Sequence, residues 1–259
     1  MKKKLGVAII TGGGGGIGEA CVERLAAEGY VCVVIDSSDQ AAKLVAKVHK
    51  AHSFNIDVSD EIALRLCANK VERDIGPVEV LVTCAAIVPK PTRALHETQN
   101  DWDRMIAVNL RGTYLSCIIF GEGMIRRENG AIVTIGSLAG MGVLPLNSYG
   151  MSKAAVIHMT KNLAVDWGRK GVRVNCVSPG PVRTPLIEAS YERGERDPTK
   201  MENQTALGRL VMPIDIANVV AFLVSDGARA VTGVNLPVDA GCGPSSLSNL
   251  YGIPSNIFE

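Results

Sequence analysis

The chain has 259 residues, of which 47% are hydrophobic, and its formal net charge is +1 at pH 7. This length suffices for one large domain that buries roughly three quarters of its unfolded surface, and the near-zero charge argues against nucleic acid as a partner. No apolar stretch approaches the roughly 18 residues of a membrane span, and seven scattered cysteines without a C-x-x-C pair favour reduced thiols in a cytoplasm over disulfides or a metal site.

A glycine-rich turn follows the first predicted strand. Val7–Ile10 is a short apolar run, and the sequence TGGGGGIG at 11–18 comes next and leads into a helical pattern that stops at Gly29. In a strand–turn–helix unit the glycines let the backbone approach a pyrophosphate, and the helix N-terminus supplies free N–H groups. A plain flexible loop is the alternative, but the flanking strand and helix favour a phosphate cradle.

The second predicted strand, Val31–Ile35, ends at an acid. Asp36 lies about twenty residues past the glycines, where a carboxylate would hold the hydroxyl groups of an adenosine ribose. No Lys or Arg follows until Lys43, so a 2′-phosphate about 4 Å from Asp36 would meet a repulsion on the order of 1–4 kcal/mol. These residues predict NAD rather than NADP. The alternative, a helix N-cap carboxylate, suits Ser38 or Asp39 better.

The next part of the chain predicts a helix over 40–50, a weak strand over 52–56, a helix over 59–75 and a strand over 78–83. Asp57 follows the weak strand. It would either accept a hydrogen bond from an adenine amino group or cap the next helix, and both roles stay open. Cys84 and Ala85 follow the fourth strand, where small side chains allow close approach to a cofactor.

Residues 97–127 have the pattern of one or two helices, with Asn109 near the middle. Asparagine is a mediocre residue for a helix interior. Its position indicates a kink or a polar task, or else a buried amide whose hydrogen bonds are satisfied. Both interpretations stay open.

A serine, a tyrosine and a lysine follow the predicted strand 131–135. Tyr149 and Lys153 lie four residues apart, so on a helix running to about Arg169 both side chains leave the same face. A nearby ammonium favours the phenolate, so we expect Lys153 to lower the pKa of Tyr149 toward the range useful for acid–base catalysis. Ser137 lies twelve residues before Tyr149, across a loop that would place its hydroxyl beside the phenol. An unrelated surface Tyr–Lys pair is the alternative.

The last third of the chain predicts a strand over 172–177, a helix over 213–225 and a strand over 235–238. The polar segment 188–204 is long for a loop, so we assign 185–210 as a lid or substrate loop. The tail 242–259 is apolar enough to pack on a neighbouring subunit or near a pocket mouth. Alternating strands and helices predict a parallel α/β sheet with helices on both faces, in a single domain over 1–259.

Five motifs in this order resemble the short-chain dehydrogenase/reductase family over roughly Leu5–Gly241. The family's T-G-x-x-x-G-I-G motif matches Thr11, Gly12, Gly16, Ile17 and Gly18, and its Asn–Ser–Tyr–Lys tetrad falls on Asn109, Ser137, Tyr149 and Lys153. Its adenine-binding acid matches Asp57 with Val58, its P-G motif and following threonine match Pro179, Gly180 and Thr184 with Val182 between them, and its late T-G…D-x-G signature matches Thr232, Gly233, Asp239 and Gly241.

The resemblance implies a doubly wound Rossmann-type domain with seven parallel strands in the order 3-2-1-4-5-6-7, assembled as a homotetramer or homodimer. It also implies hydride transfer between a nicotinamide and a substrate carbinol carbon, with Tyr149 exchanging the hydroxyl proton. Ser137 would orient the substrate oxygen, and Lys153 would hold the nicotinamide ribose as well as tune Tyr149. Asn109 would position a water molecule that completes a proton relay, and Thr184 would hold the nicotinamide carboxamide.

Two features depart from the family pattern. The usual N-N-A-G after the fourth strand is replaced by Thr83, Cys84, Ala85 and Ala86, so the fit of the cofactor there is expected to differ. The interval of twelve residues from Ser137 to Tyr149 is at the short end for the family, which predicts a tightened loop.

We therefore expect an NAD-dependent enzyme that interconverts a secondary alcohol and a ketone. The predicted substrate pocket is mostly apolar and comprises Val88, Leu138, Met141, Leu144, Leu186, Ile187 and Tyr191. One alternative is a 3-oxoacyl-thioester reductase, for which Arg126-Arg127 and Arg169-Lys170 would supply basic groups, although helix C-termini favour cations anyway. Another is a non-catalytic NAD-binding sensor or scaffold. The Tyr-x-x-x-Lys spacing argues against an enoyl reductase.

Overall fold

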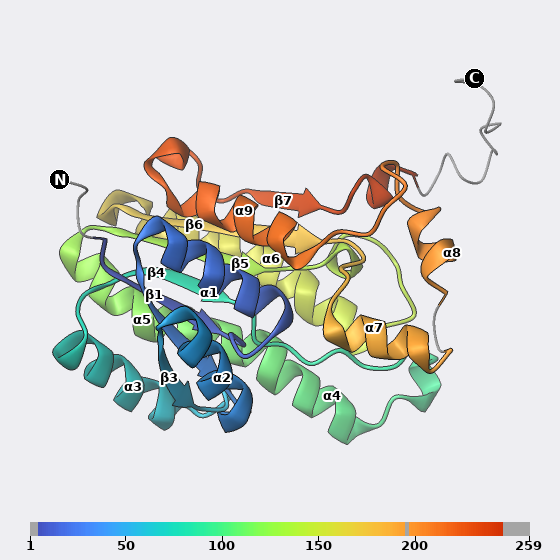
Figure 1. Ribbon diagram of the computed structural model, residues 1–259, viewed down its shortest axis with the longest axis horizontal. Helices are drawn as coiled ribbons and strands as arrows, with labels where there is room; N and C mark the ends of the chain where they lie inside the picture. The colour runs from blue at the N-terminus through green and yellow to red at the C-terminus, as the bar shows by residue number, and fades with distance from the viewer. Residues whose placement is uncertain (1–4, 195–196, 246–259) are drawn as a thin grey trace.

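The computed structural model describes residues 5–194 and 197–245 and contains one parallel sheet (Figure 1). Its strands are β1 (Val7–Thr11), β2 (Val31–Asp36), β3 (His52–Asn55), β4 (Val78–Thr83), β5 (Gly130–Ile135), β6 (Val172–Pro179) and β7 (Asn235–Val238). Their order in the sheet is β3-β2-β1-β4-β5-β6-β7, which confirms the expected arrangement. The order reverses between β1 and β4, the place where open α/β sheets form a crevice beyond their strand ends.

Helices cover both faces of the sheet. They are α1 (Gly16–Glu28), α2 (Asp39–His49), α3 (Glu61–Asp74), α4 (Gln99–Met105), α5 (Thr113–Arg127), α6 (Asn147–Trp167), α7 (Pro185–Glu192), α8 (Pro198–Glu202) and α9 (Pro213–Val224). Helices α1, α2 and α9 pack on one face, and α3, α5 and α6 pack on the other. Helices α4, α7 and α8 lie toward the carboxyl ends of the strands (Figure 1).

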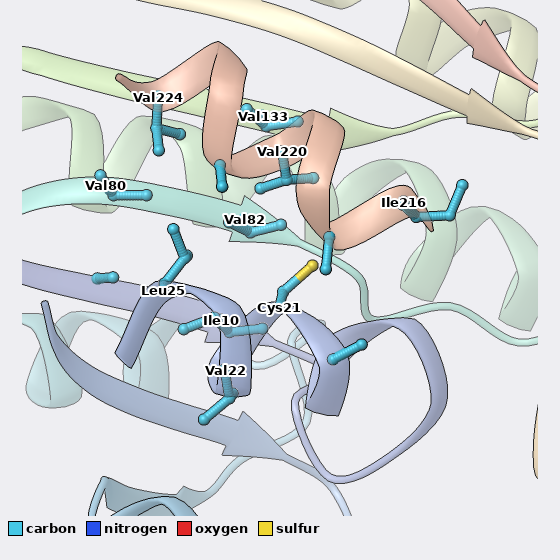
Figure 2. Close-up of a cluster of buried hydrophobic side chains, with 14 of the residues drawn as sticks. Ile10, Cys21, Val22, Leu25, Val80, Val82, Val133, Ile216, Val220 and Val224 are labelled. Atoms are coloured by element: carbon cyan, nitrogen blue, oxygen red, sulfur yellow. The ribbon is translucent and has the colours of Figure 1, made fainter. Parts of the chain in front are cut away.

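The five central strands, β2, β1, β4, β5 and β6, are mainly buried, and their alternate residues enter different hydrophobic clusters on the two faces of the sheet. Figure 2 shows the first cluster, in which Ile10, Val82 and Val133 meet α1 and α9. Their sequence neighbours Ile9 and Leu81 face α5 and α6 in the second cluster. Each such side chain contributes roughly 1.5–3 kcal/mol on burial, so the packing of both layers fixes the strand ends that carry the site.

Two expectations about helices need correction. The helix predicted to start at Ser59 begins at Glu61, because the Asp60 carboxylate caps it by accepting a hydrogen bond from Ala63 N at 3.0 Å. The segment 188–204 is not an irregular loop, since α7 and α8 occupy most of its described part.

An irregular turn lies between α4 and α5. Residues Ile106–Gly112 form a π-helical segment, and Asn109 lies inside it. The expected interruption of the helical pattern at Asn109 is confirmed, because a π-turn inserts an extra residue into an α-helix and is frequent at functional sites.

Among the residues at 5–194 and 197–245, no helix is both long and apolar enough to cross a membrane. The tail assigned from 242 onward is described only as far as 245, so the predicted packing of its remainder lies outside the described residues.

Candidate active site

The glycine turn is a tightly packed element rather than a plain flexible loop. Gly12 has a φ of 64°, and a Cβ added there would lie 2.5 Å from Ala85 N. A Cβ on Gly18 would lie 2.1 Å from Gly12 O, so neither position has room for a side chain. Gly15 precedes α1 in an extended conformation, and no side chain caps this helix within the described chain. The N-terminal N–H groups of α1 therefore suit a phosphate ligand.

Asp36 lies beside this turn and does not cap a helix. Its Oδ2 accepts a hydrogen bond from Gly14 N at 2.9 Å, and its Oδ1 accepts one from Ser38 N at 2.9 Å. Helix α2 is capped by Ser38, whose hydroxyl accepts from Ala41 N. The capping alternative for Asp36 is therefore wrong, and the carboxylate faces the glycine turn.

A cavity of about 130 Å³ lies beside Asp36. Its lining includes the predicted residues Gly12, Asp36, Asp57, Val58 and Ala85, and also Ala86, which belongs to the run of small residues expected to allow close approach of the cofactor. The sequence reasoning missed Ile35, Ser37, Ile56, Ile87, Arg104 and Val108. Several of these follow the carboxyl ends of β2, β3 and β4, a position that signals a ligand crevice in a parallel sheet. We call this space the adenosine cavity, after the ligand that the sequence predicts for it.

Asp57 takes part in a local turn within the adenosine cavity. Its Oδ1 accepts hydrogen bonds from the backbone N–H and the hydroxyl of Ser59, both at 2.8 Å. Because Asp60 caps α3, the interpretation of Asp57 as the cap of that helix is wrong. The contact with an adenine amino group stays a prediction.

Asn109 is completely buried and its amide is satisfied by the protein. Its Oδ1 accepts from Ile87 N, and its Nδ2 donates to Ile87 O, each at 2.9 Å. Nδ2 also lies 3.0 Å from the Met105 sulfur. Both interpretations of Asn109 are therefore combined, since it interrupts the helix and is also a satisfied buried amide. Its observed contacts fix the segment after β4.

Tyr149 and Lys153 share one face of α6, as their spacing predicts. Lys153 Nζ lies 5.8 Å from the centre of the Tyr149 ring. It donates a hydrogen bond of 2.8 Å to the Ile135 carbonyl, and the residue is only 2% exposed. Burial lowers the pKa of Lys153 to about 8, while the nearby Cys176 and Cys84 thiols oppose this lowering.

The expectation that Lys153 lowers the pKa of Tyr149 is not met in this structure. Burial raises the pKa of Tyr149, and a hydrogen bond with Ser137 opposes that rise. Ser137 is therefore near enough to the phenol to affect its pKa, in line with the spacing. The hydrogen bond that the Ser137 hydroxyl accepts comes from Ala139 N at 3.1 Å. The difference arises because the Lys153 amine is directed to the Ile135 carbonyl and both side chains are desolvated.

The segment after β6 borders the glycine turn. A Cβ built on Gly16 would lie 3.4 Å from Thr184 Cγ2, so the predicted threonine borders the glycine turn. Gly180 packs against Asp239, because a Cβ there would lie 2.7 Å from Asp239 Cα. Val182 is buried and forms an isolated parallel bridge with Val211.

The predicted substrate residues have mixed exposure. Val88, Met141 and Leu144 are exposed, whereas Leu138, Ile187 and Tyr191 are half-buried. The Tyr191 hydroxyl lies 3.5 Å from the Met201 sulfur, which joins α7 to α8. The side chain of Leu186 lies outside the described part of the chain.

Two loops near the start of α6 are joined by hydrogen bonds that nothing in the sequence predicts. Thr92 N donates to Pro145 O at 3.1 Å, and Asn147 Nδ2 donates to Thr92 O at 3.2 Å. The Ser148 hydroxyl donates to the Glu97 carboxylate. These contacts fix the start of α6, and therefore the backbone of the residue next to Ser148, Tyr149.

A larger cavity of about 850 Å³ lies at the opposite, amino-terminal edge of the sheet. Its lining contains none of the predicted cofactor or substrate residues. Its half-buried Arg173 donates to the backbone carbonyls of Leu223 and Ser225, which end α9. Arg173 therefore holds the end of α9, and the predicted chemistry lies at the carboxyl edge.

Comparisons with known proteins agree with this arrangement. A family profile described as enoyl-(acyl carrier protein) reductase matches residues 12–243. Galactitol 2-dehydrogenase of Rhizobium johnstonii is 36% identical over 90% of this chain and 93% of its own. Meso-2,3-butanediol dehydrogenase of Serratia marcescens is 35% identical, covering 91% and 93% of the two chains. The mouse (3R)-3-hydroxyacyl-CoA dehydrogenase is 34% identical, covering 93% and 97%.

Solved structures are similar over nearly the whole chain. A protein described as ribose-5-phosphate isomerase from Brucella melitensis 16M has a TM-score of 0.92 and 41% identity, covering 95% of each chain. ElxO with NADP bound has a TM-score of 0.87 and 27% identity, covering 93% of this chain and 99% of its own. Together with the glycine turn and the shared face of Tyr149 and Lys153, these matches show that the chain belongs to the short-chain dehydrogenase/reductase family, whose members are nicotinamide-dependent oxidoreductases.

Proposed function

We propose that this protein is an NAD-dependent oxidoreductase that interconverts a secondary alcohol and a ketone. The observation that carries the proposal is the convergence of Ser137, Tyr149 and Lys153 at the carboxyl edge of the sheet. The glycine turn at the same edge has no room for a side chain at Gly12 or Gly18. Related dehydrogenases of galactitol and butanediol support a substrate with a secondary hydroxyl group.

In the proposed reaction, Tyr149 exchanges a proton with the substrate oxygen. The Ser137 hydroxyl, whose interaction with the phenol lowers the pKa of Tyr149, would form a hydrogen bond with the same substrate oxygen and hold it in place. A bound nicotinamide supplies or accepts the hydride. Lys153 is poised near its pKa of about 8 to share a proton with groups around Tyr149, and Asn109 holds the Ile87 backbone that borders the crevice.

The cofactor preference is assigned to Asp36. Its carboxylate lines the adenosine cavity, where it would hold the ribose hydroxyls and repel a 2′-phosphate. Arg104, on α4, is a cation that lines the same cavity, so the effect of Asp36 on a 2′-phosphate is tested against that charge. The NADP bound to ElxO makes this preference a specific point to test.

The other assignments are also proposals. Cys84, Ala85, Pro179, Gly180, Val182 and Thr184 would border the cofactor, and Val88, Leu138, Leu144, Leu186 and Tyr191 would border the substrate. Segment 185–210 would act as the substrate loop of a single domain over 1–259. We expect a homotetramer or homodimer in the cytoplasm, with the tail from 242 packed at a subunit boundary or pocket mouth.

A thioester substrate is the second candidate, and the mouse hydroxyacyl-CoA relative favours it. The predicted basic groups support it less than expected. Arg127 donates hydrogen bonds to Glu72 and to the Val78 carbonyl, and Lys170 pairs with Glu128. Arg127 is therefore engaged within the protein, whereas the Lys170–Glu128 pair is exposed and contributes little.

A panel assay tests the proposal. Secondary alcohols and polyols, and 3-hydroxyacyl thioesters, are each incubated with NAD⁺ or NADP⁺, and reduced cofactor is followed by its absorbance. Isomerisation of ribose 5-phosphate is measured in parallel without added cofactor, because a similar structure carries that description. Reduction of NAD⁺ by a simple secondary alcohol is expected. Isomerisation without turnover of any alcohol would contradict the proposal.

A further inference from the structure

The π-helical segment Ile106–Gly112 contacts both sides of the adenosine cavity. On one side, Asn109 holds the backbone of Ile87, which lines the cavity, through two hydrogen bonds of 2.9 Å. On the other side, Arg111 Nη1 donates a hydrogen bond of 2.7 Å to the backbone carbonyl of Ser59. The segment therefore joins the chain after β4 to the chain after β3.

Ser59 in turn orients Asp57. Its backbone N–H and its hydroxyl both donate to Asp57 Oδ1, and within the described residues Asp57 Oδ2 accepts no hydrogen bond. A carboxylate held by one oxygen presents the other to a ligand in a fixed direction. The Arg111 guanidinium thus holds the backbone carbonyl of Ser59, and the backbone N–H of the same residue holds Asp57.

Gly112 makes a second contact with this turn. A Cβ on Gly112 would lie 2.6 Å from Val58 Cγ2 and 3.2 Å from Val58 O. Val58 lines the adenosine cavity and is only 5% exposed. The backbone of the π-helical segment therefore lies directly against the cavity wall, and no side chain fits between them.

The ion pairs of Arg111 do not explain its orientation. Its Nη2 lies 3.7 Å from Glu61 Oε2, and both side chains are largely exposed. Exposed pairs of this kind contribute little. Arg65 pairs with the same Glu61 and with Glu122, yet within the described part of the chain it makes no hydrogen bond with Ser59. Substitution of Arg65 is therefore a matched control, because it removes a cation that pairs with Glu61 but leaves the contact with the Ser59 carbonyl intact.

We propose that Arg111 is a positioning residue for the adenosine half of the cofactor, acting through the Ser59 carbonyl on Asp57 and Val58. Arg111 does not itself line the adenosine cavity. The inference rests on the proposed nicotinamide cofactor, whose adenosine half is assigned to this cavity. It adds a residue outside the cavity to the determinants of cofactor affinity.

The test measures binding without turnover. ADP affinity is measured by calorimetry and NADH affinity by fluorescence for the native chain and for Arg111→Ala, Arg111→Lys, Gly112→Ala and Arg65→Ala. We expect Arg111→Ala to weaken ADP and NADH by the same factor, roughly three- to tenfold. Arg111→Lys should keep part of the affinity, since it retains one donor, and Arg65→Ala should bind like the native chain.

Gly112→Ala tests the second contact independently. Alanine favours a helix more than glycine does, so the substitution should not weaken the helix itself and, by that effect alone, should leave ADP affinity unchanged. If the added methyl group displaces Val58, ADP affinity should fall. Unchanged ADP affinity in Arg111→Ala would overturn the inference whatever Gly112→Ala does, as would loss of NADH affinity alone or equal losses in Arg65→Ala. A native chain that binds neither ADP, NADH nor NADPH would instead overturn the proposed function itself.

Discussion

Lys153 Nζ donates a 2.8 Å hydrogen bond to the backbone carbonyl of Ile135, the last residue of β5. The bond joins α6 to the strand that leads to Ser137, so it fixes the two candidate catalytic segments relative to each other. The same burial that makes this bond possible lowers the pKa of the amine to about 8. Lys153 was expected to shift the pKa of Tyr149, and its own pKa is strongly shifted instead.

The lowered pKa of Lys153 predicts a specific dependence of stability on pH. The unfolded lysine binds its proton up to about pH 10.4, whereas the folded one loses it near pH 8. Between these values the unfolded state binds more protons, so the free energy of unfolding should rise with pH, by roughly 3 kcal/mol in total. Lys153→Met should remove this rise. Denaturant unfolding between pH 7 and 10.5 measures it, and identical profiles for both proteins would contradict the assignment.

Thr83 predicts a stabilising substitution. Its buried Oγ1 is without a hydrogen-bond partner among the described residues, and burying an unpaired hydroxyl costs about 1–3 kcal/mol. Thr83→Val should therefore raise the free energy of unfolding. Thr134 is paired in register with Thr83 on β5, but its hydroxyl bonds that of Thr160 at 2.7 Å. Thr134→Val should destabilise by leaving Thr160 with less hydrogen bonding, and equal effects in urea unfolding would argue against this account.

Two glycines of the turn, Gly15 and Gly18, should differ in their tolerance of a side chain. Gly18→Ala would place a methyl group 2.1 Å from Gly12 O, so the turn must open, at a cost of typically 1–3 kcal/mol for overpacking. Gly15→Ala has no atom within 4 Å of the added carbon and should be tolerated. NADH titration and thermal unfolding compare the two variants, and similar affinities would show that the tight turn is unnecessary for binding.

Asp36 predicts the cofactor preference. Asp36→Asn retains an oxygen that can accept from Gly14 N but removes the charge that would repel a 2′-phosphate. The ratio of kcat/KM for NAD to that for NADP should fall by a factor corresponding to about 1–4 kcal/mol. An unchanged ratio would mean that the preference is set elsewhere. Lys43→Ala, which removes an exposed cation on α2 paired with Asp39, serves as the control.

Much of the fold follows from hydrophobic periodicity and short motifs. The strand at Val78–Thr83 and the stop of α1 at Gly29 agree with prediction because apolar runs and a left-handed C-cap leave a local signal. Helices α7 and α8 were predictable too, since Pro185 and Pro198 occupy first-turn positions that favour helix starts. The polar composition of 188–204 outweighed that signal.

The remaining features depend on tertiary structure. Nothing near Asn109 in the sequence specifies a π-helical turn or the paired bonds to Ile87, which is 22 residues away. The bond between Ser148 and Glu97 joins residues 51 apart. The raised pKa of Tyr149 was also missed, because four-residue spacing places Lys153 on the same face but does not determine how deeply both groups are buried.

Proton exchange by Tyr149 is the central claim, and single-turnover hydride transfer with a secondary alcohol tests it most directly. Tyr149→Phe should slow NADH formation by about 10²–10⁴-fold while NADH binds with native affinity, because the ring remains and only the phenolic oxygen is lost. Tyr114→Phe, at an exposed position on α5, should react at the native rate. Native-rate hydride transfer by Tyr149→Phe would contradict the account.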